Sequence, residues 1–213
     1  RPKAALPLAG GPLIFDRIEV LSRDAPPRII SADQAPADVL ARLTAPRAAI
    51  AGLDMARPTI MGILNVTPDS FTDGGQHNAP AAALTHARTM QGQGADIIDV
   101  GGESTRPGAT EVPAGDEVAR TAPVIATLRA AGLSLPISID TRKTAVARAA
   151  IEAGATLVND VSGFTFDDAL APYCATENLP VCVMHAQGDP QTMQQNPRYD
   201  DVLLDVYDFL ATR

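Results

Sequence analysis

The chain has 213 residues, 46% of them hydrophobic and 20% charged, which is typical of a globular protein with one substantial core. Its formal net charge is −8 and no basic run occurs, so the composition argues against a nucleic-acid-binding surface. No run of about 18 apolar residues is present, which excludes a membrane-spanning helix, and we expect a cytoplasmic protein.

The first 57 residues differ in composition from those that follow. A candidate strand over residues 14–21 mixes polar and apolar side chains, and a stretch rich in Pro and Ala extends from residue 24 to residue 51. Neither stretch contains a recognisable catalytic constellation. We therefore predict an N-terminal extension over residues 1–57, packed outside a second domain that spans residues 58–213.

The second domain alternates short apolar runs with segments of helical character. The runs read "TIMGILN" (59–65), "ADIIDVGG" (95–102), "PISIDT" (136–141), "ATLVNDVSG" (155–163) and "PVCVMHAQG" (180–188). Nearly continuous hydrophobicity indicates strands buried on both faces of a parallel sheet, and we expect a buried, reduced thiol at Cys182. Helices are predicted over residues 80–93, 116–131, 143–153 and 167–177, and from Val202 onward.

Alternating strands and helices predict βαβ crossovers, in either a doubly wound open sheet or a closed barrel. No Gly-x-Gly-x-x-Gly follows the first run, which disfavours a dinucleotide-binding open sheet. Polar side chains end separate runs, and the carboxyl ends of barrel strands converge on one mouth. These residues are Asn65, Asp99, Glu103, Asp140, Asn159, Asp160 and His185. We predict an α/β fold of the (β/α)8 TIM barrel type with about five βα units, and we expect the other three to lie outside this sequence.

Asp140 and Asn159 end consecutive apolar runs, so we expect both side chains to point into the same mouth. A carboxylate beside an amide suits a flat heterocycle that offers N–H donors to the acid and acceptors to the amide. Two other roles remain open for Asp140. It can pair with Arg142, or it can cap the helix that starts near Lys143.

Residues 101–110, "GGESTRPGAT", combine paired glycines with hydroxyl groups and a guanidinium. Ser104, Thr105 and Arg106 suit a phosphate or carboxylate group, and the glycines allow the backbone to approach a ligand closely. A plain turn is the alternative. Glu103 is expected to support this loop by pairing with a neighbour.

The stretch "NVTPDSFTDGG", residues 65–75, follows the first apolar run. Asn65 offers a neutral oxygen to a hard cation such as Mg²⁺, which is usually shared with substrate phosphates. Asp69 and Asp73 add two carboxylates. Pro68 and the pair Gly74-Gly75 predict a loop that closes over a ligand, and an Asx-turn at Asp69 in a surface loop is the alternative.

Five motifs in order resemble the signatures of the dihydropteroate synthase family over most of residues 58–200. They are "MGILNVTPDSFTDGG" (61–75), "DIIDVGGESTRPGA" (96–109), "ISIDTRK" (137–143), "VNDVSG" (158–163) and "VCVMHAQG" (181–188). The resemblance implies a (β/α)8 enzyme of folate biosynthesis. Such an enzyme joins 6-hydroxymethyl-7,8-dihydropterin diphosphate to 4-aminobenzoate and releases diphosphate.

The resemblance also implies a role for each matching residue. The pterin is bound by Asp140 and Asn159, with Met184 lining its slot, and Mg²⁺ by Asn65. Residues of the two loops contact the diphosphate and aminobenzoate, namely Phe71, Asp73, Thr105, Arg106 and Pro107. Arg106, Asp73 and Phe71 are the expected catalytic residues. His185 is expected to pack locally. We expect only small-molecule partners, no nucleic acid and no membrane, and a homodimer.

Later family segments, including an Asp-Pro-Gly, a pocket Lys and a final Ser-Arg-Lys, do not occur in this sequence. Two other readings therefore stay open. One is a pterin-binding methyltransferase domain that uses the same acid and amide. The other is a non-catalytic fragment of the barrel.

Overall fold

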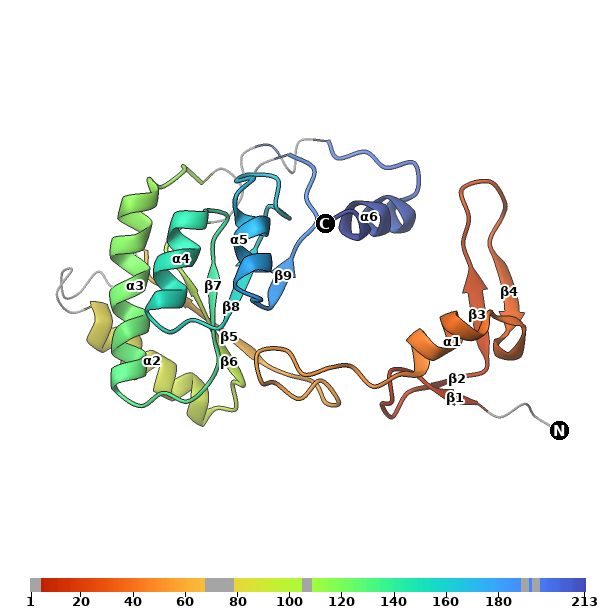
Figure 1. Cartoon of the computed structure of the whole chain (residues 1–213), viewed down its shortest axis with the longest axis horizontal. Helices are drawn as coiled ribbons and strands as arrows, with labels where there is room; N and C mark the ends of the chain where they lie inside the picture. The colour runs from red at the N-terminus through yellow and green to blue at the C-terminus, as the bar shows by residue number, and fades with distance from the viewer. Residues whose placement is uncertain (1–4, 68–78, 105–108, 189–191, 193–195) are drawn as a thin grey trace.

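A computed structural model describes residues 5–67, 79–104, 109–188, 192 and 196–213 (Figure 1). The extension begins with two antiparallel hairpins, β1 (Leu6–Pro7) with β2 (Ile14–Phe15) and β3 (Arg17–Val20) with β4 (Arg28–Ser31). A 3-10 turn, η1 (Ala32–Gln34), and helix α1 (Ala37–Thr44) follow. The prediction of a single strand over residues 14–21 was wrong, because Asp16 separates β2 from β3 and each of these strands pairs with a different partner.

The extension has almost no core of its own. Of its described residues before β5, only Ala32 is buried. It lies at one end of the molecule, away from α3 and α4 (Figure 1). The connection between β3 and β4 reaches helix α6 (Val202–Ala211) through Arg23, which pairs with Asp205 and Asp208. The division of the chain after residue 57 stays a prediction.

The second part of the chain is built of five βα units, as predicted. The five strands are parallel and hydrogen-bonded in chain order, and a helix follows each of them. The strands are β5 (Met61–Asn65), β6 (Ile97–Gly101), β7 (Ile137–Asp140), β8 (Leu157–Asp160) and β9 (Val181–Val183). The helices before α6 are α2 (Ala79–Gly92), α3 (Ala114–Ala130), α4 (Thr144–Glu152) and α5 (Leu170–Thr176).

The units are arranged as in a barrel. Strand order never reverses, and α2 contacts α3, α3 contacts α4, and α4 contacts α5, so these helices cover the same face of the sheet (Figure 1). A doubly wound sheet has helices on both faces. The predicted α/β barrel class is therefore confirmed, although the described strands do not close into a ring.

The hydrophobic core lies between the sheet and these helices. Leu64, Val100, Ile139 and Val158 point into it and are fully buried. Side chains alternate between the two faces of a strand, so Ile63 lies on the opposite face and is 62% exposed. Cys182 was expected to be buried but is exposed, because it pairs in register with Asn159 on this opposite face.

Within the described part of the chain, no helix combines the length and the apolar character needed to cross a membrane.

Candidate active site

One row of residues crosses the sheet at the carboxyl ends of its strands. Asn65 pairs in register with Gly101, Gly101 with Asp140, and Asp140 with Asn159. Residues paired in this way present their side chains on the same face, and here it is the face opposite the helices. The structure thus brings together Asn65, Asp140 and Asn159, three of the predicted site residues.

Gly101 leaves space between two of the polar groups. A methyl group at this position would lie 3.6 Å from Oδ1 of Asn65 and 3.6 Å from Oδ2 of Asp140. Both oxygens therefore face the position where a side chain is missing. A ligand atom placed above Gly101 is within reach of the amide and the acid together.

Asp99 lies directly below this row and orients one of its members. It is two residues before Gly101, on the same face of β6, and only 5% exposed. Its Oδ2 accepts a 3.1 Å hydrogen bond from Nδ2 of Asn159, so the amide oxygen of Asn159 remains available to a ligand. Burial raises the pKa of Asp99, and the hydrogen bond from Asn159 partly opposes this shift.

Asp140 is the acid of the row, and its pKa is strongly raised. Burial, together with the negative charges of Asp99, Glu117, Asp160 and Glu103, raises the pKa of Asp140 to about 7. Among the described residues, none donates a hydrogen bond to its carboxylate or forms an ion pair with it. The acceptor sites of Asp140 are therefore free for a ligand that brings N–H donors.

The two alternative roles considered for Asp140 are filled by other residues. Arg142 pairs with Glu103, at 3.3 Å from Nε to Oε2 and from Nη2 to Oε1. The backbone N–H of Thr144, at the start of α4, donates to Oδ2 of Asp167 at 2.8 Å. Asp140 is thus left with neither function.

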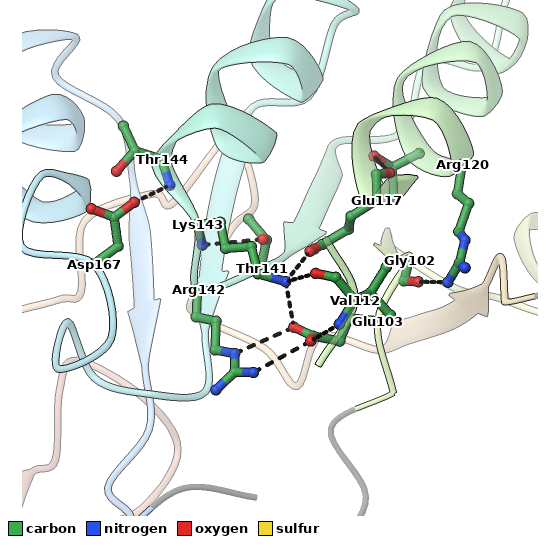
Figure 2. A network of polar contacts seen from close by, with 11 residues as sticks. Gly102, Glu103, Val112, Glu117, Arg120, Thr141, Arg142, Lys143, Thr144 and Asp167 are labelled. Atoms are coloured by element: carbon green, nitrogen blue, oxygen red, sulfur yellow. Dashed lines mark hydrogen bonds and ion pairs between the residues drawn. The ribbon is translucent and has the colours of Figure 1, made fainter. Parts of the chain in front are cut away.

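Glu103 supports the segment after β6, as expected, and does so within a larger network (Figure 2). Its Oε1 accepts a 2.8 Å hydrogen bond from the backbone N–H of Val112, and its Oε2 lies 3.0 Å from Nζ of Lys143. Burial alone raises the pKa of Glu103, but the hydrogen bonds from Arg142, Val112 and Lys143 outweigh burial and hold that pKa below its ordinary value.

Met184 and His185 follow β9 directly. The backbone N–H of Met184 donates to the carbonyl of Asp160, which fixes it beside the end of β8, and its side chain is exposed. His185 packs edge-on against Phe209, with ring centroids 4.8 Å apart, and near Tyr199. This local packing is the role predicted for His185.

Six of the candidate residues lie outside the described parts of the chain. They are Asp69, Phe71, Asp73, Thr105, Arg106 and Pro107. Their roles stay predictions.

The donor set at the end of β5 limits the kind of metal that it can hold. The described residues include no group of three or more His, Cys, Asp or Glu placed to bind an ion. The neutral oxygen of Asn65 faces the same space as Oδ2 of Asp140, which fits a hard cation that takes most of its ligands from a bound substrate and water. The expected role of Asn65 in Mg²⁺ binding is compatible with this arrangement and stays a prediction.

An acid and an amide lie side by side at the carboxyl edge of this parallel α/β sheet, the edge at which barrel proteins carry their functional residues. Residues 61–213 match the family described as pterin binding enzyme, and the chain belongs to this family.

Its relatives include dihydropteroate synthases. The protein of Escherichia coli K12 is 50% identical over 154 residues, which are 72% of this chain and 54% of the relative. That of Synechocystis is 47% identical over 157 residues, covering 74% of this chain and 54% of the relative. The chain thus spans about half the length of these relatives, and the predicted resemblance is confirmed.

Solved structures agree with these matches. The dihydropteroate synthase of Yersinia pestis, solved with a sulfonamide drug complex, matches with a TM-score of 0.68 and 49% identity over 75% of this chain and 57% of that chain. The Burkholderia cenocepacia enzyme complexed with 7,8-dihydropteroate matches with a TM-score of 0.64 and 47% identity, over 75% and 53% of the two chains.

Proposed function

We propose that this chain provides the pterin site of a dihydropteroate synthase. The reaction joins 6-hydroxymethyl-7,8-dihydropterin diphosphate to 4-aminobenzoate and releases diphosphate. The observation that carries the proposal is the row Asn65, Gly101, Asp140 and Asn159, in which an acid with no partner among the described residues stands next to an oriented amide. The 7,8-dihydropteroate bound to the Burkholderia cenocepacia relative is a product of this kind.

The row recognises the edge of the pterin ring. Asp140 accepts the adjacent ring and amino N–H groups, which favours its ionised form and lowers its raised pKa when the ligand binds. Asn159 presents its amide oxygen, because its Nδ2 already donates to Asp99. Met184, beside the end of β8, borders the slot from the next strand.

The bond-making step is a displacement at the methylene carbon of the pterin. The aromatic amine of 4-aminobenzoate forms the new C–N bond, the C–O bond to diphosphate breaks, and the amine then loses a proton to water. An aromatic amine needs placement more than activation, and Phe71 and Pro107 provide a closed pocket for it. Arg106, Thr105 and Asp73 complete the site around the departing diphosphate.

Asn65 is the residue proposed to hold Mg²⁺, which when bound supplies positive charge to the diphosphate oxygens. We also propose that the enzyme is a cytoplasmic homodimer.

The test is a diphosphate-release assay with both substrates and Mg²⁺, carried out on the protein and on Asp140→Asn. We expect release that requires 4-aminobenzoate and is strongly reduced in the variant. Methyl transfer from a methylated folate to a corrinoid protein, without diphosphate release, would refute the proposal and support the methyltransferase reading.

A further inference from the structure

Four charged side chains form a buried cluster just beyond the carboxyl ends of β6 and β7: Glu103, Glu117, Arg142 and Lys143 (Figure 2). Their exposed fractions range from 0% to 7%. Buried charges are costly unless each one is paired and hydrogen-bonded, and two acids with two bases cancel here. No step of the proposed reaction uses these four groups, so the cluster requires another explanation.

Lys143 lies at the centre of the cluster. Its Nζ donates to the carbonyl of Val112 at 2.7 Å, to Oε2 of Glu117 at 2.7 Å and to Oε2 of Glu103 at 3.0 Å. These acceptors use all three donors of an ammonium group. The 17 basic residues of the chain include only two lysines, Lys3 and Lys143, so a lysine at this buried position stands out.

The acceptors belong to both ends of one segment. Glu103 lies two residues after the end of β6, and Val112 lies two residues before the start of α3. The N–H of Val112 donates to Oε1 of Glu103, so residues 103 and 112 are held side by side. Lys143 then ties this pair to Glu117, in the first turn of α3.

Two further contacts hold Glu103 and its neighbour in place. Arg142 pairs with Glu103 while its guanidinium lies 3.9 Å from the ring centroid of Phe166. Arg120 of α3 donates to the carbonyl of Gly102 at 2.9 Å. The two ends of segment 104–111 are therefore fixed relative to β7, because Lys143 lies only three residues after Asp140, the last residue of that strand.

We infer that Lys143 is a positioning residue for the proposed reaction, because it holds the two ends of segment 104–111 in place beside the strand that carries Asp140. This inference rests on the proposed function, in which Thr105 and Arg106, within that segment, meet the diphosphate and aminobenzoate. The pterin contacts on β7 and β8 do not include Lys143. Loss of Lys143 therefore slows turnover without weakening pterin binding.

The test compares Lys143→Met with the double variant Glu117→Gln/Lys143→Met in the full protein. The double variant removes the acid Glu117 together with the base, so no buried carboxylate of Glu117 is left unpaired. It therefore allows the test even if the single variant fails to fold. We expect both variants to lower kcat about a hundredfold, as for a small misplacement of a catalytic group, with unchanged affinity for the pterin diphosphate by calorimetry. Hydrogen–deuterium exchange is expected to rise in a peptide covering residues 103–112 and to stay unchanged in β6.

Arg129→Met is the matched control. Arg129, a part-buried cation of α3, donates to three acceptors as well, but these are the carbonyls of Leu133, Leu135 and Gly154, at the opposite end of the strands. We expect this variant to lose stability without a specific loss of kcat.

Two results would overturn the inference: pterin affinity falling in proportion to kcat, or a double variant with wild-type kcat and wild-type exchange. The second would show that Lys143 only neutralises Glu117. Absence of diphosphate release by the unmodified protein would count against the proposed function, and the exchange data would still decide whether Lys143 holds the segment.

Discussion

Replacing Asp140 with Asn is expected to stabilise the free protein, and the size of the effect depends on pH. The fold raises the pKa of Asp140 from 3.8 to about 7, chiefly by burial. The unfolded chain therefore releases this proton before the folded chain does. The stability contributed by the protonated acid is complete below pH 3.8 and is lost as the pH rises towards 7.

The magnitude follows from the size of the shift. One pKa unit corresponds to about 1.4 kcal/mol, so at pH 8 the ionised carboxylate lowers the free energy of unfolding by up to about 4 kcal/mol. At pH 5 the same calculation gives about 1.5 kcal/mol. Asn has nearly the same shape as Asp and no charge, and it avoids this cost at both pH values.

The assay is urea unfolding followed by circular dichroism at pH 5 and pH 8. We expect Asp140→Asn to be more stable than the unmodified protein at both, with the larger gain at pH 8. Asp168→Asn, at an exposed position, serves as the control and is expected to change stability little. A variant that is no more stable than the unmodified protein, or a gain that is the same at both pH values, would refute the reasoning.

Further predictions concern the ligand. Asp140→Asn is expected to weaken pterin binding by about 2–4 kcal/mol in calorimetry, because a charged acceptor is lost, and unchanged affinity would contradict the site. Pterin affinity of the unmodified protein is expected to fall about tenfold from pH 8 to pH 6, since the acid must first lose its proton; a flat profile would argue against its role. Gly101→Ala adds a methyl group at ordinary contact distance and is expected to block ligand binding with little loss of stability. Gly102→Ala places Cβ 2.7 Å from Cγ2 of Thr121 and is expected to lower the free energy of unfolding in urea by about 1–3 kcal/mol. The opposite ranking of the two glycines would be inconsistent with the register of β6. Arg106→Ala is expected to reduce kcat more than pterin affinity in steady-state kinetics, and the reverse would count against its assignment to the diphosphate.

Much of the fold could be predicted because its signal is local. Each strand of the central sheet is a short apolar run and each helix a periodic segment, so the five units appear in the sequence in order. Strands of a barrel end at one mouth, and this rule alone predicts that Asp140 and Asn159 lie together. The strands of the N-terminal extension are harder to predict, because strands of two to four residues leave almost no pattern in the sequence.

Other parts of the site depend on contacts between distant segments. The sequence marks Asp99 as a strand-end acid without indicating its role, although its spacing of two residues from Gly101 places both on one face. The sequence indicates only that Lys143 lies at the start of a predicted helix. Its partners lie 26 to 40 positions away, and no pattern within β7 or α4 reveals them.

The sequence by itself determined the five strands of the central sheet, which residues end them, and that an acid and an amide end consecutive strands. The tertiary structure decided which of these groups touch. Strand register placed Asn159 against Asp99 and left Asp140 without a partner among the described residues, and the packing of α3 against β6 and α4 buried Lys143 among two acids and a carbonyl. The physical reason is that hydrophobicity and backbone propensity act over a few residues, whereas burial and charge pairing depend on the distance between atoms in the folded chain.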